Sequence, residues 1–169
     1  DQGEGSRFKI ILPLSMAVID GMVCTVGKEK YVFPLSQVHE TLKPTRELIN
    51  YSKTLGNVLN LSGENIQIFQ MKDLLNRKEL NVIDVEFQTA IVVRRNNFTQ
   101  AILVDSILHQ QQIVIKQLGA EISKQKGFMC SSILGDGLAS LIIDIIELLE
   151  EGSVLKSMKS VELLTEGAA

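Results

Sequence analysis

Short apolar runs, each ended by residues typical of tight turns, most constrain what this chain can fold into. The runs recur at a spacing of about 8–12 residues, which is typical of strands in β-sandwiches and β-barrels. The turn signals are strongest at Asn96-Asn97 and at Gly135-Asp136-Gly137, because Asn and Gly tolerate the positive φ angles of tight hairpins. The pattern therefore predicts an all-β chain in which successive strands pair as hairpins.

The first long run, residues 16–26, is apolar on both of its faces. Met22 and Cys24 share one parity of a strand, whereas Ile19 and Val23 share the other. A strand that is apolar on both faces is expected to be buried on both faces. Pro34 is expected at a strand end, an edge or a bulge, because proline has no N–H to donate to a neighbouring strand.

Helix is predicted in only two places. Residues 71–76 suit one or two helical turns, and residues 144–151 repeat charged and apolar positions at helical spacing, with Gly152 suited to the helix end. The polar residues 41–56 predict a long loop. Each half of the chain also contains a strand, a glycine turn and a strand, which suggests two small barrels that share one core.

The composition favours a folded protein and argues against several classes of partner. The 169 residues are 45% hydrophobic and 22% charged, and this length allows one domain or two very small lobes. With 5% aromatic residues and no Trp, the core is expected to be aliphatic. The net charge of −3 argues against nucleic acid and against a polybasic membrane patch. No apolar stretch is long enough to cross a bilayer, so no direct membrane insertion is expected.

The residues that most often carry chemistry do not stand at the spacings that chemistry needs. His39 is expected in a strand-like stretch and His109 in a turn, and neither has a metal ligand at a recognised spacing. Cys24 and Cys130 lie in apolar runs, where a free cysteine is commonly buried. Asp136 between two glycines is interpreted as a turn residue. We therefore predict no catalytic residue and no metal site, which favours a binding module over an enzyme.

Four segments, taken in order, resemble one known family. Phe8 to Met22 resembles the strand and linker that join the ATP-binding domain of the chemotaxis histidine kinase CheA to its CheW-like C-terminal regulatory domain. The other three segments resemble motifs of that regulatory domain: Tyr31 to Val38, Val104-Asp105 with Gln110 to Lys116, and Ile133 to Gly137 with Leu141 to Asp144. The likeness runs from about Gly3 to Leu149, which is nearly the whole chain.

The resemblance implies two small five-stranded SH3-like β-barrels around a shared core, with a short C-terminal helix. It implies three parts: residues 1–15 as the last strand of a preceding ATP-binding domain and its linker, residues 16–151 as the CheW-like regulatory domain, and residues 152–169 as a C-terminal tail. Gly3-Glu4-Gly5-Ser6 resembles the last glycine box of a GHKL-type ATP-binding domain. ATP is therefore expected only in a kinase domain that precedes this fragment, and no cofactor is expected in the fragment itself.

The same resemblance implies that the domain binds other proteins. The implied partners are a CheW-type adaptor protein, the cytoplasmic tip of a chemoreceptor and the kinase domain of the same parent chain. The implied location is the cytoplasm, at the receptor array beneath the inner membrane. The implied task is to transmit receptor state to the kinase.

Two groups of residues are candidate contacts with these partners. Val38 and Glu40 resemble an adaptor-contacting segment of the family, although a core position suits Val38 equally well. We predict that Val38→Arg weakens adaptor binding with little change in far-UV circular dichroism or melting, whereas unfolding would place Val38 in the core. The second group is the predicted hairpin of Gly135, Asp136, Gly137 and Leu138.

Two other functions stay open. A standalone CheW-like adaptor would share the fold, but adaptors lack a lead-in such as Leu12-Pro13-Leu14 from a kinase domain. The encoded sequence upstream of Asp1 would distinguish the two. An enzyme built on a small β-barrel is disfavoured because the sequence offers no paired base and nucleophile and no metal spacing.

Overall fold

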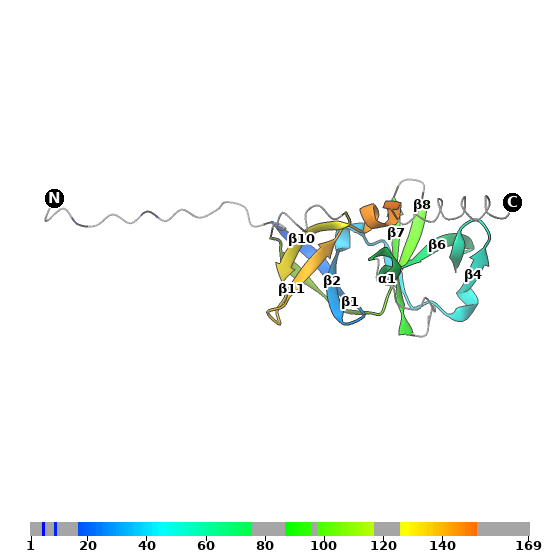
Figure 1. Ribbon diagram of the computed structural model, residues 1–169, viewed down its shortest axis with the longest axis horizontal. Helices are drawn as coiled ribbons and strands as arrows, with labels where there is room; N and C mark the ends of the chain where they lie inside the picture. The colour runs from blue at the N-terminus through cyan, green and yellow to red at the C-terminus, as the bar shows by residue number, and fades with distance from the viewer. Residues whose placement is uncertain are drawn as a thin grey trace, which may run out of the picture.

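The computed structural model describes residues 5, 9, 17–75, 87–95, 98–116 and 126–151, and strands dominate these ranges (Figure 1). The strands are β1 (Val18–Val26), β2 (Glu29–Pro34), β3 (Glu40–Leu42), β4 (Ile49–Ser52), β5 (Gly56–Leu61), β6 (Glu64–Gln70), β7 (Thr89–Arg95), β8 (Phe98–Val104), β9 (Ser106–Val114), β10 (Phe128–Ile133) and β11 (Ala139–Ile143). The described helical segments are α1 (Met71–Leu74), residues 145–151, and two 3₁₀ turns, η1 (Leu35–Gln37) and η2 (Arg46–Leu48). The predicted all-β class and both predicted helices are confirmed, while Gly152 lies outside the described residues.

The strands form two sheets, which we call lobe 1 and lobe 2. Lobe 1 is a five-stranded sheet in the order β10-β11-β2-β1-β9, and lobe 2 is a six-stranded sheet in the order β3-β7-β8-β6-β5-β4. An isolated bridge between Lys116 and Ser131 joins the end of β9 to β10, which closes lobe 1 into a barrel. The implied pair of small barrels is confirmed, with one strand more in lobe 2 than expected.

The prediction of a long loop over residues 41–56 is wrong, because this segment carries two short edge strands. β3 pairs with β7 at one edge of lobe 2, and β4 pairs with β5 at the other. Leu42, Leu48 and Ile49 from this segment are partly buried against the lobe 2 core. Strands of three and four residues show too few alternations to be recognised, and polar neighbours conceal them.

Lobe 1 is assembled from both ends of the described chain. β1 and β2 precede all the strands of lobe 2, whereas β9, β10 and β11 follow them. β1 lies between its hairpin partner β2 and the distant strand β9, and it pairs antiparallel with each of them. The echo between the two halves of the sequence therefore does not correspond to the two lobes, because lobe 1 contains strands from both halves.

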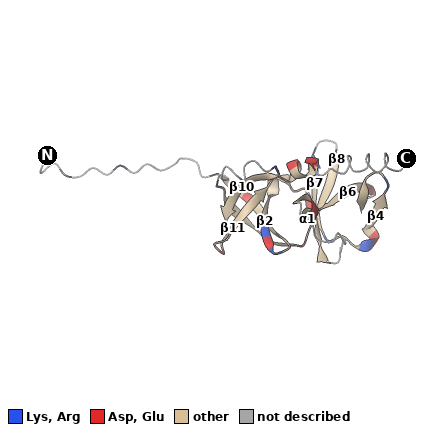
Figure 2. Ribbon diagram, viewed as in Figure 1, with Lys and Arg blue, Asp and Glu red and all other residues tan. Residues whose placement is uncertain are grey.

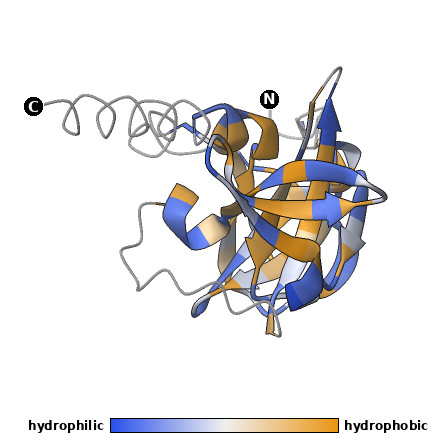
Figure 3. Cartoon of the chain, turned by 90° about the vertical axis from the view of Figure 1, so that its right-hand side faces the viewer, coloured by the Kyte–Doolittle hydropathy of each residue, from blue (hydrophilic) through white to orange (hydrophobic). Residues whose placement is uncertain are grey.

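Strand alternation distributes the apolar side chains among three clusters. β1 directs Met22 into a core shared by the lobes, and its neighbour Val23 into the interior of lobe 1. β8 likewise directs Ile102 into the shared core and Leu103 into the interior of lobe 2. The hydrophobic and hydrophilic segments alternate visibly along the strands in Figure 3. The prediction that the first strand is buried on both faces is confirmed for its central residues.

The two predicted hairpin signals coincide with paired strands. β7 and β8 pair in register from Thr89↔Val104 to Arg95↔Phe98, and the intervening Asn96 and Asn97 lie outside the described residues. β10 and β11 pair on either side of Gly135-Asp136-Gly137. Charged residues stand in small separate groups on the described ribbon, for example at the β1–β2 turn and on the 145–151 helix (Figure 2).

Candidate docking surface

A row of exposed apolar side chains crosses four strands of lobe 1. Val18 on β1 pairs directly with Val114 on β9, and Ile133 on β10 pairs with Ala139 on β11. Val114 and Ile133 are each two residues from the Lys116–Ser131 bridge, so antiparallel pairing places them opposite each other. The exposed fractions are 52% for Val18, 37% for Val114 and 54% for Ile133, and Ala139 is also exposed. We call these four residues the lobe 1 stripe.

The stripe exists because the β10–β11 hairpin buries small polar side chains and exposes apolar ones, which is the reverse of the usual pattern in a strand. Ser132 and Ser140 pair with each other and point inward, with exposed fractions of 2% and 3%. Their hydroxyls donate to the carbonyl oxygens of Val114 (2.9 Å) and Lys30 (2.8 Å), which satisfies the buried oxygens. Their neighbours Ile133 and Ala139 point outward instead. Such departures from binary patterning are expected at functional surfaces.

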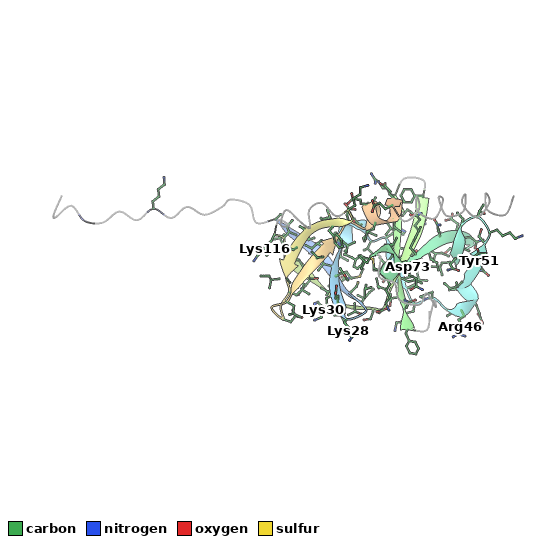
Figure 4. All side chains as sticks on the ribbon, in the orientation of Figure 1. Lys28, Lys30, Arg46, Tyr51, Asp73 and Lys116 are labelled. Carbon is green, nitrogen blue, oxygen red and sulfur yellow. The ribbon has the colours of Figure 1, made fainter. Side chains whose placement is uncertain are left out.

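Polar rows border the stripe on both sides. On one side lies the bridged pair of Lys116 and Ser131, and on the other lies the exposed pair of Asp20 and Gln112. Lys116 lies at the lobe 1 end of the molecule, opposite the end that carries Tyr51 (Figure 4). An apolar row with a polar border is the arrangement found at protein–protein interfaces.

The predicted contact residues Gly135, Asp136, Gly137 and Leu138 form one braced turn beside the stripe. Gly137 has φ +81°, and its amide donates to the Leu134 carbonyl (2.9 Å). Asp136 pairs with Lys30 on β2 and accepts the Leu138 amide at 3.0 Å. The hydrogen bond from Lys30, followed by the bond from the Leu138 amide, lowers the pKa of Asp136. The ion pair therefore stabilises the turn fully at pH values above the ordinary aspartate pKa. This stabilisation is lost as the pH falls through the lowered pKa of Asp136.

Val38 and Glu40 lie on a different sheet from that turn. Glu40 is exposed on β3, an edge strand of lobe 2, and pairs with Val92 of β7. Val38 precedes β3 and is partly buried against the shared core. The structure therefore groups the 135–138 turn with the lobe 1 stripe and separates both from Val38 and Glu40. The roles of all six residues as partner contacts stay predictions.

The two histidines occupy ordinary structural positions. The His39 backbone N–H donates to the Val92 carbonyl at 2.8 Å, just before β3 begins. His109 lies inside β9, so its predicted placement in a turn is wrong. The register of β9 with β1 shifts between Val23 and Cys24, and this irregularity breaks the alternation that would have indicated a strand.

The two cysteines do not have the environment of reactive thiols. Burial raises the pKa of the Cys24 thiol to about 12, and burial also raises the pKa of Cys130. A reactive cysteine needs a lowered pKa. Within the described ranges, no three His, Cys, Asp or Glu residues lie close enough together to hold a metal ion. Nor does any helix in that part of the chain have the length and apolar character needed to cross a membrane.

Sequence reasoning did not identify the stripe. Val18 stands in the run of residues 16–26 that is predicted to be buried on both faces, and nothing in the apolar runs around Val114 and Ile133 indicates an exposed face. The segment Ser131-Ser132-Ile133 nevertheless contains a signal. Successive side chains of a strand point to opposite faces, so if Ser132 points inward, Ile133 must point outward. Which of the two points inward depends on the pairing of the strand, and that pairing involves distant segments.

Comparison with known proteins gives a consistent set of relatives. The CheW-like domain model matches residues 20–153. The chemotaxis protein CheA of Rhizobium meliloti is 34% identical over 143 residues, which are 85% of this chain and 19% of that protein. The chemotaxis protein CheA of Borreliella burgdorferi is 35% identical over 148 residues, which are 88% of this chain and 17% of that protein. The chain thus spans about a fifth of the length of these relatives.

A solved structure has the same fold. The crystal structure of the scaffolding protein TtCheW from Thermoanaerobacter tengcongensis superimposes with a TM-score of 0.59 at 17% sequence identity. The match covers 76% of this chain and 90% of that protein. At this identity the match shows that the two chains share a fold.

Proposed function

The chain belongs to the CheW-like domain family, and from that premise we propose that it is the receptor-coupling regulatory domain of a chemotaxis histidine kinase. Its task is binding and not catalysis. It docks a CheW-type adaptor and the cytoplasmic tip of a chemoreceptor, and it passes receptor state to the kinase domain of its parent protein. The kinase domain supplies ATP binding, and residues 16–151 need no cofactor. The site of action is the receptor array in the cytoplasm, beneath the inner membrane.

The lobe 1 stripe is the observation that carries this proposal. Apolar side chains are exposed here in a row beside serines that point inward, so the isolated domain leaves apolar surface in water at this place. The stripe and the 135–138 turn together offer an apolar centre and a polar border. We assign this surface to the adaptor, because a scaffold of the same fold can present a complementary lobe end to it.

Binding of the adaptor is tested by mixing the chain with the CheW-type adaptors of the same organism in analytical ultracentrifugation. A complex at about 100 μM would reveal an interaction as weak as roughly −5 to −6 kcal/mol. Failure of every adaptor to bind at that concentration would remove the basis for the coupling role.

Placement of the adaptor on the stripe is tested with two matched variants. Ile133→Asp introduces a charge into the stripe, and we expect it to weaken adaptor binding at least about tenfold. Tyr51→Asp makes the same kind of change at a side chain 76% exposed on lobe 2, and we expect unchanged affinity. Equal affinity of the wild type and Ile133→Asp would exclude the stripe as the adaptor site.

The alternative of a standalone adaptor shares the CheW-like family and fold, but the matching scaffold is only 17% identical. The matches at 34% and 35% identity are to the chemotaxis protein CheA. A start codon a few residues before Asp1 in the gene would favour the adaptor, whereas an ATP-binding domain encoded there would favour the kinase.

A further inference from the structure

The two lobes are held together so extensively that a hinge between them is not expected. Their shared core contains buried side chains from both sheets, from α1 and from the 145–151 helix. Among them are Met22, Cys24, Phe33, Phe69, Met71, Ile91, Ile102, Ile143, Ile145 and Leu149. Lobes joined by a small polar interface move relative to each other, but a large apolar interface prevents that motion. Packed interiors of this kind deform little.

Polar contacts brace the same junction. Asp105 links three elements, because it accepts the Gly27 amide of the β1–β2 turn at 2.6 Å and pairs with Lys72 of α1 at 3.4 Å. Gln37 of η1 accepts the Ile145 amide at 2.8 Å and donates to Asp144 at 3.2 Å, which fixes the start of the 145–151 helix. Each of these contacts joins segments that are distant in the sequence. A binding event on lobe 1 is therefore not expected to change the angle between the lobes.

The lobe 1 stripe includes the N-terminal end of β1. Val18 is the first residue of β1, and it pairs with Val114, the last residue of β9. One residue further out, the Ile115 amide donates to the Ala17 carbonyl at 3.0 Å. The covalent chain reaches lobe 1 through Ala17. A partner that covers the stripe thus covers the point at which the preceding chain joins the domain.

We propose that this domain transmits adaptor binding as one rigid body, by fixing the N-terminal end of β1 against β9 rather than by moving one lobe against the other. The inference rests on the proposed function, because the adaptor is the occupant of the stripe. A partner that buries Val18 stabilises the Val18–Val114 pair and the Ile115–Ala17 hydrogen bond. Linkage is reciprocal. A preceding domain that holds this end of β1 in place therefore raises adaptor affinity by the same factor by which bound adaptor stabilises this end of β1.

Hydrogen exchange of two backbone amides in the chain, measured with and without saturating adaptor, tests the proposal. The Ile115 amide reports on the end of β1, and the Asp105 amide, which donates to Thr25 at 3.0 Å, reports on the lobe junction. Any ligand of the folded state slows exchange that requires global unfolding, so the Asp105 amide measures that general stabilisation. We expect exchange at Ile115 to slow at least about tenfold more than exchange at Asp105. Equal slowing at both amides, or none at Ile115, would overturn the proposal.

Two stripe variants with similar exposure separate transmission from affinity. Val18→Ser removes the side chain that connects the partner to β1, and we expect the protection of Ile115 to disappear even at saturating adaptor. Ile133→Ser lies two strands away, and we expect roughly tenfold weaker binding but full protection at saturation. Full protection in Val18→Ser would contradict the proposal.

The outcomes distinguish this inference from the proposed function. If the adaptor binds the wild type but leaves the Ile115 amide unprotected, the inference fails and the proposed function stands. If no adaptor binds, both fail. Unchanged melting temperatures of the two serine variants serve as the control for folding, which is expected because both side chains are about half exposed.

Discussion

Ser132 and Ile133 are adjacent in the chain, yet their burial is the reverse of their hydrophobicity. The serine is 2% exposed and the isoleucine is 54% exposed. The inward position is acceptable for the serine because its buried hydroxyl donates to the Val114 carbonyl. The same hydrogen bond attaches β10 to β9 beside the bridge that closes lobe 1.

Substitution of this serine tests that account. Ser132→Ala removes the hydroxyl and leaves the Val114 carbonyl without that bond, so we expect the free energy of unfolding to fall by about 1 kcal/mol. Ser131→Ala, at the outward neighbour, is the matched control and should change it by less than about 0.5 kcal/mol. Urea unfolding measures both, and equal shifts for the two variants would show that the buried hydroxyl contributes nothing specific.

Glu40 permits a cleaner test of the predicted β3 contact than Val38. Val38 packs against the shared core, so Val38→Arg alters packing as well as surface, whereas Glu40 is exposed. If the edge of lobe 2 binds an adaptor, Glu40→Lys should weaken binding about tenfold through charge reversal, with unchanged melting. Glu64→Lys, at an exposed position on β6, is the control. Identical affinities for both variants would remove Glu40 from the candidate contacts.

At the scale of elements, hairpins and helices follow from local pattern, whereas their junctions depend on single side chains. The crossover from β8 to β9 is one residue long, and that residue is Asp105. Its carboxylate bonds to the β1–β2 turn of lobe 1 and to α1 beside lobe 2. One side chain thus sets the geometry at which the chain passes from lobe 2 back into lobe 1.

Two substitutions separate the parts of this junction. Asp105→Ala removes the hydrogen bond to the Gly27 amide and the Lys72 ion pair, so we expect a loss of about 1–2 kcal/mol in the free energy of unfolding. Lys72→Met removes the partly exposed ion pair but keeps the hydrogen bond of Asp105 to the Gly27 amide, and it should cost less than about 0.5 kcal/mol. Thermal and urea unfolding measure both. A loss as large for Lys72→Met would assign the effect to the ion pair instead.

For the whole molecule, the shared core makes the two lobes depend on each other. Lobe 2 is continuous in sequence from β3 to β8, but one face of its sheet completes the shared core with lobe 1. Without lobe 1, that face and the adjoining α1 would expose Phe69, Met71, Ile91, Ile102 and Val104 to water. Small domains have little stability to offset such exposure.

We therefore expect residues 38–106, expressed alone, to show no cooperative thermal unfolding, while the whole chain unfolds in a single transition. Differential scanning calorimetry and the binding of a hydrophobic dye compare the two. A cooperative transition in the isolated segment would show that lobe 2 folds independently, and it would also weaken the rigid-body argument.

Leu149→Ala in the whole chain should lower the stability of both lobes together, by about 2–5 kcal/mol.

The sequence alone predicted the features that depend on near neighbours. The alternation of Met22 and Val23 indicated a strand buried on two sides, the glycines around Asp136 indicated a hairpin, and the spacing of charges indicated the 145–151 helix. Each of these signals is a period or a turn that is complete within a few residues. The family resemblance added the two-barrel architecture, which local pattern only suggested.

Only the tertiary structure decided which strands are neighbours, and the docking surface depends on that. Val18 and Val114 are almost a hundred positions apart in the sequence, and no local period reveals that they pair. β3 and β4 are too short to show alternation without the strands on which they lie. The stripe is exposed because the register of β10 turns Ser132 inward and Ile133 outward. Register is set by pairing across the sheet, and a shift of one residue would exchange the two faces.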